Sequence, residues 1–289
     1  MKASREAIAH DRATVHLLSV QLARFDGPYH HHDALELTAI EAGSGIRVLD
    51  GQVAPFGPGD LVLVPPQVAH VWWSRDAAQP VAARVLHLGL AALAGLPELR
   101  EGGSGLAALD RPARIEGALA ESVRAELRAL ADCAGLERLG RALALLGRIA
   151  RAEAEVHWLE RPLGRLPAGD AEPIGRVLAW IHRDYARPLR VAEGAALLHV
   201  TPAAFSRAFL RRVGRPFSVY VNDLRIAEAC LALRRSRRPI AEVAWACGFP
   251  TLGHFHRQWV QRIGCAPRDY RREGPGAPGR RLRRPPESR

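Results

Sequence analysis

Two arginines in the C-terminal half, Arg207 and Arg257, have the chemistry that reading a DNA base requires. A guanidinium group can donate two hydrogen bonds to O6 and N7 of guanine, whereas alanine and leucine can only contact the methyl group of thymine. The residues expected on the same exposed helix faces are Ala203, Ser206 and Arg207 in one segment, and Leu252, Gly253, His256 and Arg257 in the other. The alternative for each arginine is a phosphate contact or a surface salt bridge.

The sequence around Arg257 predicts two short helices joined by a tight turn. One face of the first helix has the i, i+3, i+4 spacing of Ile240, Val243 and Ala244, and Gly248 is a helix stop. Thr251 can then cap a second helix, whose buried face is Phe255, Trp259 and Ile263. Such a pair presents its second helix to the major groove, although an ordinary helical hairpin has the same spacing.

Residues 189–213 have the same organisation around Arg207. Thr201 is a helix cap followed by Pro202 at the first helical position, and the buried side of this helix is Phe205, Phe209 and Val213. The preceding helix contains Gly194, which lowers helix propensity and removes core volume. We therefore expect this unit to be less rigid, and the unit around Arg257 to provide much of the sequence recognition.

The C-terminal segment also contains a series of specific short motifs. They are Ala246-Cys247-Gly248-Phe249, His254-Phe255-His256-Arg257, Gly264-Cys265-Ala266-Pro267 and Tyr270-Arg271. Together they resemble the C-terminal signature of AraC/XylS-type transcription regulators, and the resemblance extends over residues 172–272. It implies a seven-helix DNA-binding domain with two helix-turn-helix units, and double-stranded promoter DNA as its partner.

The charge of the chain is concentrated in this same half. Residues 170–289 contain 23 arginines and 10 acidic residues, a net charge of +13, while the remainder carries −2. Such a surface suits a polyanion, because each phosphate that is neutralised releases counterions. No segment has the pattern of a membrane span or secretory signal, and the four cysteines have no metal-binding spacing. We expect a cytoplasmic protein with free thiols and a disordered basic tail at 273–289.

The N-terminal half has the pattern of short β-strands separated by glycine, proline and aspartate. The apolar or alternating runs are Val15–Leu22, Leu35–Ala39, Ile46–Leu49, Leu61–Val64 and Val81–Leu88. They predict a β-sandwich or barrel. The whole chain is therefore expected to be α+β, with a β-barrel domain at 1–110 and an all-α domain at 172–272.

Three histidines and a glutamate fall among these strands at the spacing of two motifs of the cupin barrel: His30, His32, Glu36 and His70. In metal-binding cupins the matching residues hold a divalent metal, so the resemblance implies these four as candidate ligands of Fe, Mn, Ni or Zn. Gln67 and Ser74 depart from the second motif. We favour a pocket in which the same side chains, together with Trp72, bind a small organic effector such as a sugar, with no cofactor.

Residues 111–163 have the pattern of two amphipathic helices. Their apolar stripes are Ile115, Leu119, Val123, Leu127 and Leu130, and then Leu136, Leu139, Leu143, Leu146 and Ile149. These helices either cover the barrel or, as the AraC/XylS resemblance implies, form a dimer interface. Residues 164–171 are the predicted linker.

The sequence thus predicts a transcription regulator, an activator in the resembled family, that responds to a small-molecule effector. Its expected partners are promoter DNA, the effector and a second copy of the chain, with RNA polymerase as a further candidate and no membrane. The alternative is a metal-dependent cupin enzyme, or a metal sensor, fused to a DNA-binding domain. We rank an enzyme lower because no separate acid/base pair or nucleophile accompanies the four candidate ligands.

Overall fold

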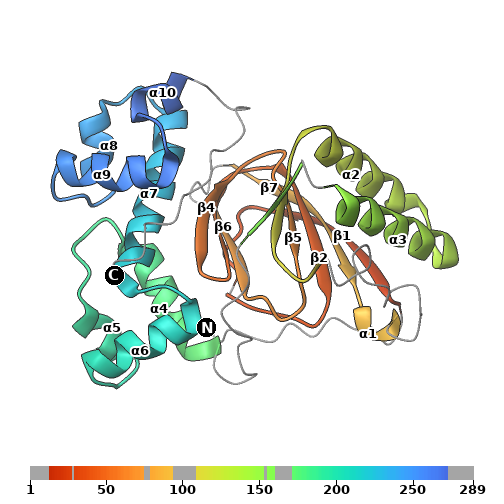
Figure 1. Cartoon of the computed structure of the whole chain (residues 1–289), viewed down its shortest axis with the longest axis horizontal. Coiled ribbons are helices and arrows are strands. Elements are labelled where there is room, and N and C mark those ends of the chain that lie inside the picture. The colour runs from red at the N-terminus through yellow and green to blue at the C-terminus, as the bar shows by residue number, and fades with distance from the viewer. Residues whose placement is uncertain are drawn as a thin grey trace.

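The computed structural model describes residues 13–27, 29–74, 79–93, 109–152, 155–159 and 171–272. A β-rich N-terminal body lies beside an all-helical C-terminal body (Figure 1), which confirms the predicted α+β class. The predicted linker at 164–171 lies outside the described residues except for Ala171, which already belongs to a helix. The predicted tail at 273–289 lies wholly outside them.

The larger sheet of the N-terminal body contains six antiparallel strands. In spatial order they are β1 (Val15–Leu22), β7 (Val81–Leu88), β2 (Leu35–Ala42), β5 (Leu61–Val64), β8 (Ala113–Ile115) and β9 (Val156–Trp158). One face is apolar and is covered by α2 (Gly117–Ala129) and α3 (Gly135–Arg151), as Figure 1 shows. The short elements α1 (Leu90–Leu93) and η3 (Leu130–Asp132) complete this layer. The two helices therefore cover the sheet, which was one of the two predicted roles.

The smaller sheet contains β4 (Gln52–Phe56), β3 (Gly45–Leu49) and β6 (His70–Ser74), in that order. Its inner face packs against the inner face of the larger sheet, where Leu49 joins Val62 and Val64 in one buried cluster. Because side chains alternate along a strand, Ile46, Val48 and Trp73 point to the outer face. Each of these strands therefore presents one face to the interior and one to the outside.

The sequence missed β4, β8 and β9. Pro55 interrupts the β4 pattern, and its missing N–H is tolerated because β4 is an edge strand. The first predicted helix is wrong at its start: Ile115, the first residue of its apolar stripe, belongs to β8, and Ala113 and Arg114 of this strand pair with β5. The helix begins at Gly117. Leu136, expected in an apolar stripe, is 83% exposed.

The C-terminal body contains seven helices among its described residues, as predicted. They are α4 (Ala171–Asp184), α5 (Val191–Leu197), α6 (Pro202–Val213), α7 (Phe217–Arg235), α8 (Ile240–Ala246), α9 (Leu252–Ile263) and α10 (Pro267–Arg272). The helix α7 is buried on most sides, because α6, α8, α9 and the strand β4 all pack against it.

The two bodies share one apolar cluster. It joins outer-face residues of the smaller sheet, including Ile46 and Val48, to Ile174 of α4 and Tyr220 of α7. The ring of Trp73 lies 4.1 Å from that of His182, centroid to centroid. The Nε2 atom of His182 and the hydroxyl of Tyr220 are hydrogen-bonded at 2.8 Å. The smaller sheet is therefore the surface through which the two bodies meet.

Candidate DNA interface and effector site

The helices α6 and α9 begin at the residues that the sequence predicted. The hydroxyl oxygen of Thr201 accepts a hydrogen bond from the backbone N–H of Ala204 at 3.3 Å. Thr251 accepts one from the backbone N–H of His254 at 3.1 Å. These caps satisfy N–H groups that have no partner inside the helix.

Both helices bury one face and expose the other. The aromatic residues Phe205, Phe209, Phe255 and Trp259 are fully buried. The predicted DNA-reading residues lie on the opposite sides: Ala203, Ser206, Arg207, Leu252, Gly253 and Arg257 are exposed and His256 is half-buried. The sequence therefore assigned the inner and outer faces of both helices correctly.

Neither Arg207 nor Arg257 pairs with a carboxylate among the residues that the structure describes. This distinguishes them from Arg187, which bonds to Asp184 at 3.0 Å and to Glu193 at 2.7 Å. The surface-salt-bridge alternative therefore has no support here, and both guanidinium groups have their donors available for an external base edge or phosphate.

Gly194 of α5 does not leave the space that the sequence suggested. A Cβ atom at this position would lie 2.4 Å from Cζ of Phe205, so the aromatic ring already occupies the volume of a side chain. The expected loss of core volume is therefore wrong. A larger residue would displace Phe205, which anchors the recognition helix of this unit.

A second site lies between the two sheets, where imidazoles surround the carboxylate of Glu36. Its Oε2 atom is 2.9 Å from Nε2 of His32, 3.0 Å from Nε2 of His87 and 3.4 Å from Nε2 of His70. The hydroxyl of Thr38 donates to Oε1 at 2.5 Å. All four partner side chains are buried. The structure thus brings together three of the predicted residues and adds His87 and Thr38.

The other predicted pocket residues surround this cluster. The ring of His30 lies 4.3 Å from that of His70, between centroids. The indole of Trp72 meets His70 edge-on at 5.5 Å, and its buried N–H has no hydrogen-bond partner among the described residues. Trp73 points to the opposite face, because side chains alternate along a strand.

Two of the histidines have their protonation fixed by backbone carbonyls. The Nδ1 atom of His32 lies 3.1 Å from the oxygen of Ala34, and that of His70 lies 2.8 Å from the oxygen of Val68. A carbonyl can only accept, so Nδ1 carries the proton. In the neutral ring, the Nε2 lone pair then faces the carboxylate of Glu36. This arrangement needs either a second proton on a ring or a cation between the groups.

Burial and neighbouring charges shift the titration of this cluster. Burial lowers the pKa of His70 to about 4, because the imidazolium form loses its hydration, and His30 adds to the effect. Burial alone would raise the pKa of Glu36, but the electrostatic influence of the neighbouring imidazoles of His70, His32 and His87 holds it well below its usual value. Glu36 is therefore a carboxylate and His70 is neutral near pH 7.

The donor set fits a divalent transition metal. His32, Glu36 and His87 each offer a ligand atom within 4.8 Å of the others, and so do His30, His32 and His70. Imidazole nitrogens with one carboxylate suit Fe, Mn, Ni or Zn. Backbone carbonyls that bind the other ring nitrogen are the usual support of such ligands.

Comparison with known proteins gives matches over both halves of the chain. The family described as "AraC-like ligand binding domain" matches residues 15–160, and that described as "Helix-turn-helix domain" matches residues 195–273. The chain belongs to the AraC family of transcription regulators. This family consists of regulators rather than enzymes, which decides against the enzymatic alternative.

The AraC-family relatives include two proteins named "HTH-type transcriptional activator RhaS". That of Klebsiella pneumoniae (strain 342) is 26% identical over 254 residues, which cover 84% of this chain and 87% of the relative. That of Escherichia coli O1:K1 / APEC is 26% identical over 269 residues, covering 87% and 90%. Among solved structures, ToxT from Vibrio cholerae O395 is 12% identical with a TM-score of 0.37, covering 91% of this chain and 99% of ToxT.

Several polar residues of this AraC-family chain make contacts in the N-terminal body that the sequence did not predict. His87 lies opposite Glu36 in the register of β7 and β2, and it is a polar residue in an otherwise apolar stretch. Arg47 contacts Asp60, and Arg114 bonds to the same carboxylate at 3.1 Å. The only local signal for His87, Arg47 and Arg114 was a polar residue inside a strand, whereas Asp60 directly precedes β5. None of the described helices is long and apolar enough to span a bilayer.

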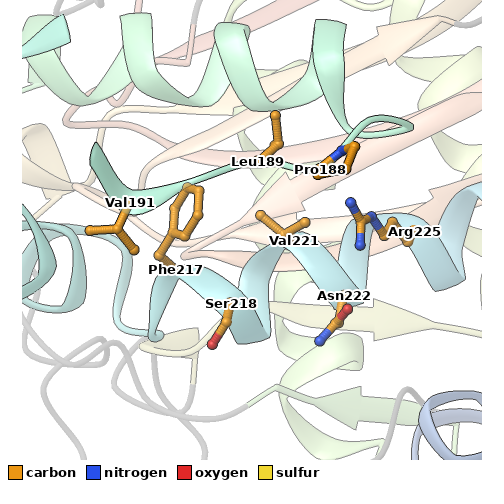
Figure 2. Close-up of a pocket in the computed structure, with 8 residues that line it drawn as sticks. All are labelled: Pro188, Leu189, Val191, Phe217, Ser218, Val221, Asn222 and Arg225. Carbon is orange, nitrogen blue, oxygen red and sulfur yellow. The ribbon is translucent and has the colours of Figure 1, made fainter. Parts of the chain in front are cut away.

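The AraC-type helical domain also has a surface groove of about 350 Å³. Figure 2 shows its apolar lining, with Leu189 and Val221 facing each other and Arg225 at one end. Arg225 donates to the backbone oxygens of Tyr185 and Arg187, both at 2.9 Å, and so fixes the chain that follows α4. The groove contains none of the residues predicted to bind DNA or effector.

Proposed function

We propose that this AraC-family regulator binds a small ligand between its two sheets and that the ligand changes how the helical domain binds DNA. The observation that carries the proposal is the alternation along β3 and β6. Their inner residues, including His70 and Trp72, face the ligand site, whereas their outer residues, including Val71 and Trp73, face α4 and α7. A ligand that moves β6 must therefore also move the surface against which the DNA-binding domain packs.

The coupling requires the ligand to bind one arrangement of the two bodies more tightly than another. A change in the position of β6 can reach the helical body through the contact of Trp73 with His182, because His182 is hydrogen-bonded to Tyr220 in α7. The helix α7 packs against both helix-turn-helix units, so a change in its contacts reaches both recognition helices.

For DNA, we propose that α6 and α9 enter successive major grooves on one face of the duplex. Their subsites would be about one helical turn apart. Arg207 and Arg257 are the side chains best suited to read guanine, and their exposure, with no carboxylate partner among the described residues, supports this role. We expect the α9 unit to provide much of the recognition, because Leu252, the half-buried His256 and Arg257 offer more varied contacts than Ala203 and Ser206.

Two ligand classes fit the site between the sheets. A polyhydroxylated organic molecule such as a sugar would bond to Glu36 and the imidazoles and stack on Trp72. The second candidate is a divalent metal ion, which the Nε2 lone pairs of His32 and His70 favour, since both face the Glu36 carboxylate. When bound, such an ion would supply the positive charge that this arrangement lacks.

Metal analysis and thermal unfolding separate the two classes. A metal sensor should contain stoichiometric Fe, Mn, Ni or Zn that a His32→Ala variant loses, and EDTA should lower its Tm. A sugar sensor should be metal-free, and one compound of a sugar and small-acid panel should raise the Tm of the EDTA-treated protein. No metal and no stabilising compound would contradict a working sensor.

We also propose that the chain acts as a homodimer and activates transcription by contacting RNA polymerase. The exposed start of α3 supports the first part, because Leu136 is 83% exposed while the rest of the helix covers the sheet. A Leu136→Asp variant that stays dimeric in light scattering would contradict this surface. In a reconstituted transcription assay, repression by the bound protein would contradict activation.

A further inference from the structure

The two helix-turn-helix units have separate apolar cores. Phe205 and Phe209 belong to one buried cluster, while Phe255 and Trp259 belong to another. The two clusters share no buried residue, and each takes its own residues from α7, such as Tyr220 for the first and Cys230 for the second. The distance and angle between the recognition helices therefore depend on how each unit is attached to α7.

A buried carboxylate on α7 connects the two units. Asp223 accepts a hydrogen bond on Oδ1 from Nε of Arg262 at 2.5 Å, and on Oδ2 from Nη1 of Arg215 at 2.9 Å. Arg262 lies in the last turn of α9, and Arg215 lies in the turn between α6 and α7. One side chain thus holds the ends of both recognition helices.

The contact has the features of a position-setting interaction. Asp223 and Arg262 are 3% and 1% exposed, so solvent does not screen the pair. Arg262 also donates to the side-chain oxygen of Gln258 at 2.6 Å, which orients its guanidinium. Charged hydrogen bonds are directional, whereas apolar contacts tolerate small rotations. The corresponding position in the first unit, 50 residues earlier, is Arg212, which is half-buried rather than buried. A buried arginine there is therefore no general requirement of this fold.

We propose that Asp223 is a positioning residue that fixes the spacing between the two DNA subsites by holding Arg262 and Arg215. This proposal rests on the proposed reading of DNA by both units. Asp223 is buried and does not reach the DNA-facing surface, so its loss relaxes the spacing between the subsites and leaves the sequence of each subsite unchanged. A residue needed only for folding would lower the binding of all spacings equally.

Selection from a random duplex library with the full chain tests this. The wild type should enrich two motifs at one spacing, and spacings longer or shorter by one base pair should bind roughly tenfold more weakly, as for a mismatched base pair. Asp223→Asn should enrich the same two motifs over several spacings, with a discrimination below roughly threefold. Glu242→Gln removes a carboxylate from an exposed pair with Arg238 and should retain the wild-type spacing.

Thermal unfolding first establishes that each variant is folded. If Asp223→Asn does not fold, the double variant Asp223→Asn/Arg262→Met is used in its place. It removes the charges of both Asp223 and Arg262, and removing a whole buried pair is better tolerated than removing one partner. A folded variant with the single wild-type spacing, or one that enriches neither motif, would overturn the proposal. A wild type that enriches only one motif or none would instead refute the proposed DNA reading itself.

Discussion

The contact between the two bodies can be broken at Gly51. This residue lies in the turn between β3 and β4 with a φ of +70°, and a Cβ atom there would lie 1.9 Å from the backbone oxygen of Val213 at the end of α6. The turn and the helix end would have to separate by more than about 1 Å to restore normal contact. In Gly51→Ala the smaller sheet can therefore no longer pack against the helical body as it does here.

A control variant, Gly59→Ala, measures the cost of placing an alanine at a positive φ without the contact between the two bodies. An alanine at positive φ costs about 1–2 kcal/mol wherever it occurs. Gly59 has a φ of +88°, and its Cβ would meet only the end of the Arg124 side chain at 3.9 Å. Gly59→Ala should therefore lose about 1–2 kcal/mol of unfolding free energy with no change in shape. Gly51→Ala should lose at least as much, and its two bodies should also separate.

Small-angle X-ray scattering of the full chain measures this separation. The radius of gyration should increase in Gly51→Ala and stay at the wild-type value in Gly59→Ala. Calorimetry should show two unfolding transitions in Gly51→Ala that are further apart than in the wild type, because each body has lost its stabilising neighbour. A Gly51→Ala variant with the wild-type scattering profile and transitions would refute the assigned contact.

Three further predictions concern the two sites and the first reading unit. Arg257→Ala should weaken specific DNA binding by roughly 1–3 kcal/mol and relax the preference at one base position, and Arg207→Ala should weaken binding less. An equal loss of affinity for all DNA sequences would instead assign the arginines to phosphate contacts. If Arg207→Ala abolished specific binding and Arg257→Ala had no effect, the α6 unit and not the α9 unit would provide most of the recognition. In metal-free protein the low pKa of His70, about 4 against 6.5 in the unfolded chain, makes the unfolded state bind the proton first as the pH falls. In urea titrations the free energy of unfolding should therefore show no loss from His70 above about pH 6.5 and should fall by roughly 3 kcal/mol towards pH 4. The His70→Gln variant should show a smaller fall over the same pH range. Gly194→Ala should destabilise the folded protein by roughly 1–3 kcal/mol, because the new methyl group would collide with Phe205, although alanine favours a helix more than glycine does. Gly140→Ala on the open face of α3 meets no neighbour and should stabilise the protein by about 0.5–1 kcal/mol. If both variants were stabilised, the tight packing at Gly194 would be contradicted.

The features that the sequence predicted are those that local rules determine. Thr201 and Thr251 cap the recognition helices because a cap depends only on residues three positions apart. The apolar periodicity also gave the faces of α6 and α9. Pro55, which lies inside the strand, hid β4, and the short strand at Ala113 resembled a helix start until its pairing with β5 was known.

The contacts that the sequence did not predict join residues far apart in the chain. His87 meets Glu36 only through the register of β7 and β2, and Asp223 meets Arg262 only after α7 and α9 pack. No spacing rule links such pairs. Gly194 shows the opposite error, because helix propensity identified a weak position but could not show that Phe205 fills it.

The effect of a ligand on DNA binding tests the central claim most directly. The ligand is whichever metal ion or panel compound raises the Tm of the protein most, and the DNA is the duplex that the wild type selects. Fluorescence anisotropy at fixed salt should show that this ligand changes the Kd of the wild type and of Gly59→Ala by a similar factor, of about 5–150-fold. It should leave the Kd of Gly51→Ala unchanged, since its sensor no longer packs on α7. A Gly51→Ala variant that binds the ligand and responds like the wild type would contradict the proposed coupling.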